Sequence, residues 1–545
     1  MLWGDAVFPF LRSRGDSPAA VKYAESGQAA LFSALLIPVV LLAALFVFNT
    51  GQLSAVKLKT QNAADAAAFS AMQMEARELN FISYTNRAMV ANQVAIGQTI
   101  SLVSWTHYVK SLGLNIQRAG TIASFIPYVG QAIMMITNGI AKAAILLDQS
   151  VSNAARVALP ALDIADAALS GAQEIYHLSN GAFDPGTDNS KPGGAMTAVA
   201  EQTIKINDPD ARLNAILLAS NLGQYFKNRS DLIQRWGGDK NRAQTRMAYM
   251  INASRDGFTA ARNDLPTPLR LFSSQNLWAF GWEFRRAGGT QLAPNRDGRY
   301  VWSGMDTLSF HYWRREAGFF GGKKWSEVPL GYGASQTGNG NTFPYPGNYT
   351  ETRAQPQMRF PANDRNVLLP AYQNSGDINP GASRIAASLY PDDQDSMGSM
   401  GSTALKRPGA DSSRATAGGI TRYWDFNRRN QKLVNANGDP SDIMPFYTVV
   451  VEHARESVRD AANALRINQM ASRQDINLVL PQKAPEGQVR AVAKAQVYFR
   501  RPASIWQRND RFYEGGNLFS PFWEAHLVDL DAADRMQYAT MLGLH

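Results

Sequence analysis

The six histidines are the residues with the widest range of chemistry in this chain of 545 residues. None of them lies in an H-E-x-x-H motif or at another close spacing that would bind a metal ion. Glu452 and His453 are neighbours, but adjacent side chains point apart on a helix and on a strand alike. We expect His311 and His526, which lie in aromatic strand-like segments, to be the pair nearest to meeting in space. Ordinary packing or surface positions account for these histidines, so we assign no catalytic, cofactor-binding or metal-binding residue.

Sequence motifs for nucleotide, hydrolase and calcium chemistry are absent or incomplete. No G-x-x-x-x-G-K-[ST] motif occurs, since residues 321–324 lack the spacing and the hydroxyl, so the chain is not a secretion ATPase. No G-x-S-x-G nucleophile elbow occurs either. One loop is spaced partly like a calcium-binding loop, but its twelfth position is Phe446 instead of glutamate, which favours a turn over a weak calcium site. The oxygen-bearing residues of that loop are Asn435, Asn437, Asp439 and Asp442.

The composition indicates a large folded chain without cysteine. Hydrophobic residues make up 45% and charged residues 18%, which is enough apolar material for a sizeable core. The absence of cysteine excludes disulfides, thiolate nucleophiles and cysteine metal sites. The net charge of +9 favours weak contact with polyanions, but the basic pairs are scattered and no motif predicts specific nucleic-acid binding. Those pairs are Arg285 with Arg286, Arg314 with Arg315, Lys323 with Lys324, Arg428 with Arg429, and Arg500 with Arg501.

A charge-free apolar segment near the N-terminus has the length of a membrane span. Residues 29–48 form a run of 20 that would extend about 30 Å as a helix, the thickness of the hydrocarbon core of a bilayer. Membrane helices tolerate a proline such as Pro38. A cleaved signal peptide is the alternative, but its apolar core is usually about 7–15 residues long and no A-x-A site follows here. We therefore predict a retained transmembrane helix at residues 27–50, preceded by a tail at residues 1–26.

Small and apolar residues continue beyond this segment at alternating spacings of three and four, the pattern of a helix with a packing stripe. We predict an alanine-rich helical stalk or hairpin at residues 51–180. Its stripe would serve for oligomerisation, for packing on other subunits, or for packing inside the chain. We favour the last, because residues 145–169 offer a helical partner with its own apolar face. The stripe, our candidate interaction site, consists of Leu53, Val56, Thr60, Ala63, Ala67, Ser70 and Met74.

A second charge-free run occupies residues 119–141. Glycine, glutamine, threonine and asparagine residues dilute its hydropathy, and Arg118 and Lys142 bracket it. We predict a buried helical hairpin that turns near Pro127, with a second membrane span as the alternative. The distinction matters, since two spans would place both chain ends on one side of the membrane.

Residues 181–545 predict an α+β domain with an antiparallel or mixed sheet. We expect helices at residues 195–226, 241–263, 452–468 and 531–542. Alternating patterns predict strands at residues 307–313, 446–451, 489–499 and 523–528. A loop is expected at residues 180–194, and a long insertion of loops at residues 318–419, which are rich in Gly, Ser, Asn, Pro and Asp.

The N-terminal pattern resembles a known family. A GQAA sequence at residues 27–30, the proline-interrupted apolar run and QNAADAAA at residues 61–68 resemble the N-terminal domain of Tad (tight adherence) TadE/TadG-like pilus-assembly proteins. The resemblance covers about residues 27–71. Residues 79–93 are also similar to large members of the family, as are the C-terminal segments, residues 493–502 and 517–523.

The resemblance implies a bacterial inner-membrane protein with a short cytoplasmic N-terminus, one span, and an exported body in the periplasm. Charge alone does not set the orientation, because three basic residues precede the apolar run and two follow it closely. Ala20 and Glu25 match the register of a processed prepilin, but the residues between them are polar and the span begins after Glu25. The unprocessed TadG-like branch is therefore the better fit.

The predicted function is that of a membrane-anchored structural or assembly component of a Tad/Flp-type pilus or related secretion system. It would act through protein–protein contacts with other pilus or secretion proteins, without enzyme activity or a cofactor, and self-association remains open. One alternative is an envelope adhesin that binds polyanionic surfaces. A membrane-tethered envelope hydrolase is the other, supported only by polar and aromatic loops that would form a cleft.

Overall fold

A computed structural model describes most of the chain. The described residues are 22–181, 194–235, 240–265, 267–272, 274–277, 280–294, 300–315, 323–337, 379–388, 420–427, 444–454, 458, 488–501 and 514–541.

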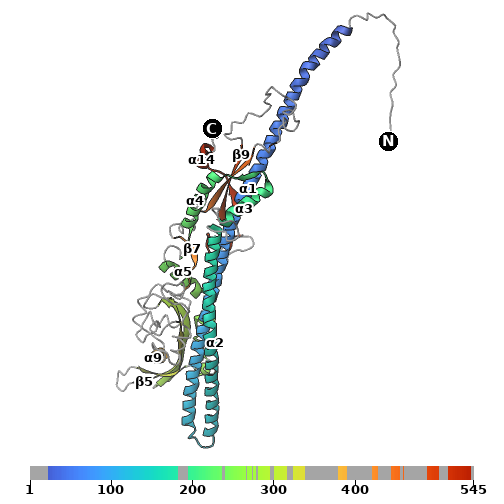
Figure 1. The fold of residues 1–545 in the computed structure, drawn as a ribbon. Coiled ribbons are helices and arrows are strands. Elements are labelled where there is room, and N and C mark those ends of the chain that lie inside the picture. The colour runs from blue at the N-terminus through green and yellow to red at the C-terminus, as the bar shows by residue number, and fades with distance from the viewer. Residues whose placement is uncertain are drawn as a thin grey trace, which may run out of the picture.

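One helix forms the axis of the molecule. Helix α1 (Lys22–Ala123) contains 102 residues and is about 150 Å long at 1.5 Å per residue. It includes Pro38 without ending there. The apolar segment and the first part of the predicted stalk are therefore a single continuous element, which runs the length of the molecule in Figure 1.

Helix α2 (Gly130–Gly181) runs back along α1 and forms a hairpin with it. The turn falls beside Pro127 as predicted, and Tyr128 adopts a positive φ of 69° there. The prediction that this hairpin is buried is wrong at its tip, because Phe125 is 85% exposed and Tyr128 fully exposed. The sheet nearest the tip contacts α1 before the turn is reached. The contact lies near Asn115, whose side chain donates a hydrogen bond to the Leu330 carbonyl.

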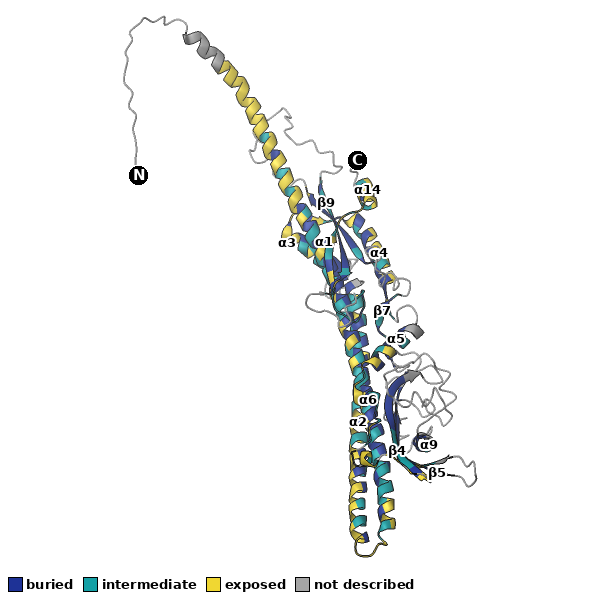
Figure 2. Cartoon of the chain, turned by 180° about the vertical axis from the view of Figure 1, so that it is seen from behind, coloured by how far each residue is buried: buried dark blue, intermediate teal, exposed yellow. Residues whose placement is uncertain are grey.

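A four-stranded antiparallel sheet, the proximal sheet, packs on α1 near the apolar segment. Its order is β1 (Ala211–Leu213), β8 (Phe446–Ala454), β9 (Gln488–Phe499) and β10 (Trp523–Val528). Along β9 most alternate residues are buried, the period-2 pattern of a strand with one covered face. Helices α3 (Gly194–Asn207), α4 (Ala215–Leu232) and α14 (Ala532–Met541) complete this unit, as Figure 2 shows.

A second antiparallel sheet, the distal sheet, lies farther along the hairpin. Its strands are β3 (Ser274–Asn276), β4 (Phe280–Pro294), β5 (Tyr300–Arg315) and β6 (Lys323–Gln336), in that order. Trp302 of β5 is buried in a core with Ile96 and Ile100 of α1. The remaining described elements are α5 (Lys240–Ala253), α6 (Gly257–Ala260), α7 (Thr267–Leu271), α9 (Pro380–Ser388) and a ribbon of β2 (Ile233–Arg235) with β7 (Trp424–Phe426).

The predicted mixture of helices and antiparallel sheets is confirmed, and the predicted strands lie within β5, β8, β9 and β10. Three helix predictions need correction. The helix expected at residues 241–263 ends at Ala253, and the short helix α6 (Gly257–Ala260) follows it as a separate element. The helix expected at residues 195–226 is interrupted by β1, because the Asp208-Pro209-Asp210 sequence breaks it and Pro209 has no backbone N–H. The helix expected from Glu452 begins in β8, and residues 455–457 and 459–468 lie outside the described part.

The long insertion predicted at residues 318–419 is not loop throughout, since it contains β6 and α9. Glycine in β6 reflects close packing rather than a turn. A Cβ atom at Gly333 would lie 2.3 Å from the Tyr108 backbone nitrogen and 2.5 Å from the Ser104 carbonyl oxygen. The strand therefore needs glycine to lie directly against the backbone of α1.

Candidate functional site

No described part of the chain covers the apolar segment of α1. Nearly all of its side chains from residue 30 to residue 48 are exposed, and its most apolar window has a mean hydropathy of 2.8 with no residue buried. Helix α2 is the second described helix with the length and composition of a span, but its window is less apolar, with a mean hydropathy of 1.3. By length and composition, α1 is suited to cross a bilayer.

The alanine stripe that follows lies inside the chain. Thr60, Ala63 and Ala67 have no exposed surface, while the other four members of the stripe, Leu53, Val56, Ser70 and Met74, are partly buried. Ala67 belongs to a core with residues of β8, β9, β10 and α3. The predicted partner at residues 145–169 instead packs farther along α1, where Asn92 donates to the Leu162 carbonyl at 2.5 Å. The small side chains thus let a sheet approach α1 closely.

Polar side chains beside this stripe fasten α1 to the C-terminal segments. Gln61 donates to the Val492 carbonyl at 3.1 Å. Asn86 donates to two carbonyl oxygens, those of Trp424 at 3.0 Å and Leu518 at 2.8 Å. Residues 79–93 and 517–523, two segments for which the sequence predicted a family resemblance, are therefore neighbours in space. The sequence suggested each segment separately but gave no sign of these hydrogen bonds.

A buried charged cluster on the next turns joins α1, α2 and α4. Arg229 forms ion pairs with Glu75 and Glu78, and His177 Nδ1 lies 2.7 Å from a Glu78 oxygen. Burial raises the pKa of Glu75, and Arg229 offsets this only in part. Burial acts on Glu78 too, but Arg229 and His177 outweigh it and lower the pKa of Glu78. Neither glutamate was predicted from the sequence. Their i, i+3 spacing places both on one face of the helix, and in a stalk with few charges this pattern could have indicated a buried charged cluster.

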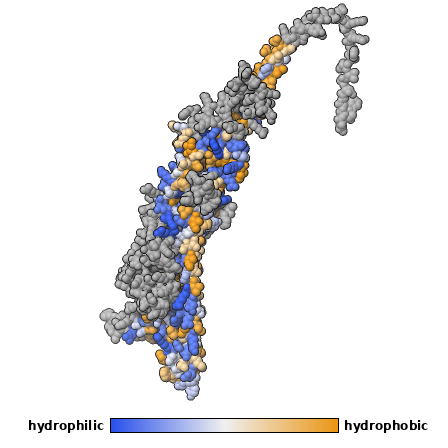
Figure 3. All heavy atoms as spheres, viewed as in Figure 1, coloured by the Kyte–Doolittle hydropathy of each residue, from blue (hydrophilic) through white to orange (hydrophobic). Residues whose placement is uncertain are grey.

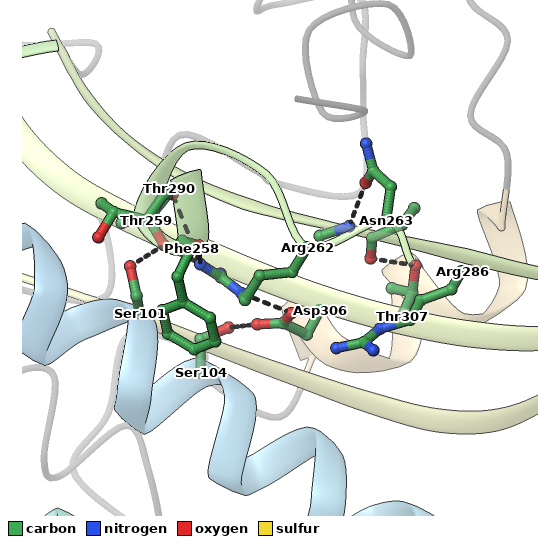
Figure 4. A network of polar contacts seen from close by, with 12 residues as sticks. Ser101, Ser104, Phe258, Thr259, Arg262, Asn263, Arg286, Thr290, Asp306 and Thr307 are labelled. Carbon is green, nitrogen blue, oxygen red and sulfur yellow. Dashed lines mark hydrogen bonds and ion pairs between the residues drawn. The ribbon is translucent and has the colours of Figure 1, made fainter. Parts of the chain in front are cut away.

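A second buried network fastens α1 to the distal sheet (Figure 4). Arg262 Nε donates to Asp306 Oδ1 at 2.7 Å, and both side chains are almost fully buried. Ser104 of α1 donates to the other Asp306 oxygen at 2.6 Å. Ser101 of α1 donates to Thr290 at 2.8 Å. The remaining polar atoms of a buried ion pair need hydrogen-bond partners. Because Ser104 of α1 supplies one of these partners, α1 contributes to the stability of this pair.

One group of side chains has the spacing of a metal site. Asp208, Asp210 and His453 could each offer a ligand atom. However, Lys59 lies 3.0 Å from Asp208, and His453 Nδ1 lies 2.7 Å from its second oxygen. Burial would raise the pKa of Asp208, but hydrogen bonds from Lys59 and His453 outweigh it and lower that pKa. A cation would have to displace the Lys59 ammonium, so we assign this group to structure.

His311 of β5 lies 2.9 Å from Asn379, whereas His526 of β10 stacks edge-on against Tyr498, so these two histidines lie in different sheets and do not meet. The loop at residues 435–442, which was predicted to be a turn rather than a weak calcium site, lies outside the described residues.

The basic pairs are less scattered than predicted. The antiparallel register of β5 and β6 places Arg314 opposite Lys324 and Arg315 opposite Lys323. Two of the pairs therefore meet at one end of a hairpin, while Arg285 and Arg286 lie on β4. The sequence could not show this, because the cross-strand register is set by contacts of the whole strand.

Comparison with known proteins places this geometry in context. Residues 27–74 match the Tad family model, which is described as "Putative Flp pilus-assembly TadE/G-like". The match spans the apolar segment of α1 and the alanine stripe, and it confirms the resemblance expected from the sequence. No curated protein and no solved structure matches the chain.

Proposed function

We propose that the chain is a membrane-anchored structural component of a Tad/Flp-type pilus or a related secretion system and acts through protein–protein contacts. One observation carries the proposal. The pilus-family match falls on one continuous helix, of which the first part is bare and apolar and the second part is the packing axis of the body. Such a helix joins a bilayer to a folded body without a flexible linker, so force on one reaches the other.

In this proposal the helix crosses the inner membrane once, with a cytoplasmic N-terminus and an exported body. Helix α2 supports a single crossing, because it packs along the stalk and not beside the apolar segment. Asp148 and Asp166 of α2 are buried against α1 and bonded to its polar side chains. The hairpin turn would then stand about 110 Å from the end of the apolar segment.

The placement of the charged groups supports a mechanical role without catalysis. Glu78 is held by Arg229, Asp306 by Arg262, and Asp208 by Lys59. Each pair joins segments that are distant in the sequence, as the contacts that hold a fold together do. We therefore propose that these carboxylates hold the body on α1 and that none of them acts on a substrate.

The test is restoration of pili in a bacterium that makes Flp pili and carries this chain. We expect deletion to abolish surface pili and the full chain to restore them. Leu41→Arg combined with Leu42→Arg should fail, because two arginines cost about 5–7 kcal/mol at the centre of a span, comparable with the whole gain from inserting the apolar run. Leu58→Arg combined with Asn62→Arg adds the same charges at exposed positions beyond the span and should restore pili. Unchanged pili in the deletion strain would refute the proposal.

A second candidate function is binding of a polyanionic surface, which the β5–β6 register favours. Four basic residues meet at one end of this hairpin. Replacing Arg314 and Lys324 with glutamine should weaken salt-sensitive binding to a polyanion such as heparin, because salt screens the attraction that the two positive charges contribute. Replacing the exposed Lys205 and Arg212 removes the same net charge elsewhere and serves as the control. Equal losses would show a nonspecific effect of net charge.

A further inference from the structure

Helix α2 carries a second apolar stripe that no described part of the chain covers. Its residues recur at alternating spacings of four and three over 43 residues, and all of them are exposed except the half-buried Gly171. The stripe, which we call the outer stripe, consists of Ile136, Ile140, Ala143, Leu147, Ser150, Ala154, Val157, Ala161, Ile164, Ala168, Gly171, Ile175 and Leu178. Its large side chains are between 39% and 75% exposed.

The outer stripe is distinct from the face of α2 that packs on α1. That inner face contains Ala141, Ala155 and Leu159, which are buried, together with Asp148 and Asp166. Figure 2 shows α2 with buried and exposed residues on different sides, and Figure 3 shows hydrophobic residues along the hairpin. Monomeric soluble proteins rarely expose a contiguous apolar surface of this extent.

The spacing of the outer stripe specifies the shape of its partner. Apolar residues that repeat every 3.5 residues over several heptads form the seam of a left-handed coiled coil. The partner must therefore be another long helix, which lies nearly parallel or antiparallel to α2 over about 63 Å. A globular surface or a short peptide would leave most of the stripe uncovered.

Charge favours a second copy of this chain as that partner. In a parallel coiled coil, the residues that flank the seam on one side face those that flank it on the other side of the partner helix, so charged flanks select a partner of complementary charge, whereas uncharged flanks neither select another helix nor repel an identical one. The flanking residues of α2 are uncharged from Thr137 to Ala172, and Glu174 is the first exception. The exposed charges Lys142 and Arg156 lie away from the stripe, two positions beyond Ile140 and Ala154.

Anchoring in the membrane sets the direction and register. We propose that copies of this chain associate in parallel and in register through the outer stripe of α2. This step rests on the proposed function, because copies whose α1 helices cross the same bilayer hold their hairpins side by side and at equal height. Each stripe residue then meets its own equivalent, as the seam residues of a parallel two-stranded coiled coil do.

The chain contains no cysteine, which makes disulfide trapping specific to an introduced residue. Ser150→Cys places a thiol on the outer stripe, where equivalent residues of parallel, in-register helices approach the Cα separation of about 4.4–6.8 Å that a disulfide needs. Gln149→Cys places one on the adjacent exposed position, off the stripe. In oxidised membranes of cells that express each full-length variant, we expect Ser150→Cys to give a covalent dimer and Gln149→Cys to stay monomeric.

A second pair of variants tests the stripe without relying on a single position. In the Ser150→Cys background, Val157→Glu should lower the dimer yield roughly tenfold or more, because it places like charges in the seam. Arg156→Glu, the neighbouring exposed change, should leave the yield unchanged. Absence of the dimer, an equal yield from both thiols, or trapping of a different protein would overturn the proposal. Pilus restoration by the Ser150→Cys chain is scored separately, so a failed seam and a failed pilus role are distinguishable.

Discussion

Asn80 and Trp523 exchange two hydrogen bonds although 443 residues separate them. Asn80 Nδ2 donates to the Trp523 carbonyl oxygen, and the Trp523 N–H donates to Asn80 Oδ1, both at 2.9 Å. A side-chain amide thus makes the pair of bonds that a neighbouring strand would make. The first residue of β10 is in this way fixed to the helix that carries the pilus-family match.

Asn80→Ala should destabilise the proximal unit. The change leaves a backbone N–H and a carbonyl of Trp523 without these partners, which costs about 1–3 kcal/mol. Thermal unfolding of the detergent-solubilised full chain measures the loss. Asn62→Ala removes the same side chain from an exposed position on the same helix, and it should have little effect. Equal losses in the two variants would contradict the role of this contact.

Ala67→Leu should be far more damaging than Ala66→Leu. Ala67 has no exposed surface and lies in the core against the proximal sheet, whereas Ala66 is only partly buried. Overpacking of a filled core costs about 1–3 kcal/mol. Because the stripe packs inside the chain, we expect protease resistance of the body to fall with Ala67→Leu. A body that stays resistant while association with other subunits is lost would point to an intermolecular stripe instead.

Acid should weaken the contact between α1 and Asp208. The folded-state pKa of Asp208 lies below its ordinary value of 3.8, so the stabilisation it gives is complete above that pH. It is lost as the pH falls from 3.8 through the lowered pKa. Asp208→Asn should therefore flatten the dependence of the unfolding free energy on pH below about 4. The exposed neighbour Asp210 gives the control, Asp210→Asn, and an identical acid profile for both variants would be evidence against the contact.

Arg262 and Asp306, the buried ion pair at the distal sheet, should have coupled effects on stability. Arg262→Gln or Asp306→Asn alone leaves one uncompensated buried charge, at a cost of about 3–5 kcal/mol. The double variant should lose less than the sum of the two single changes, because neither charge is left alone. Hydrogen exchange of β4 and β5 reports the local effect. Additive losses would mean that the two side chains act independently.

The sequence predicted the elements whose pattern is local. The charge-free run in α1 and the alternation in β8, β9 and β10 depend on residues a few positions apart, and they lie where expected. Strand β6 was missed because Gly331 and Gly333 suggest a loop, whereas they allow contact with Tyr108 of α1. The polar contacts of Asn80, and the register that joins β5 to β6, depend on segments distant in the sequence. No local pattern encodes them.

The outer stripe shows a related limit. The apolar face at residues 145–169 was expected to pack on the chain's own stalk, and α2 does pack on α1. The helix has two apolar faces, however, and Leu159 faces inward while Ile164 faces outward. Periodicity identifies both faces but does not say which of them the chain itself covers.

We propose that a single crossing at the apolar segment of α1 holds the whole hairpin on the exported side. Thiol labelling with a membrane-impermeant maleimide tests it, since the chain has no cysteine of its own. In spheroplasts, Gln149→Cys on the exposed surface of α2 should label without permeabilisation, and Ser13→Cys in the N-terminal tail only after it. Labelling of Gln149→Cys only after permeabilisation, or release of the labelled chain as a soluble protein, would contradict the account.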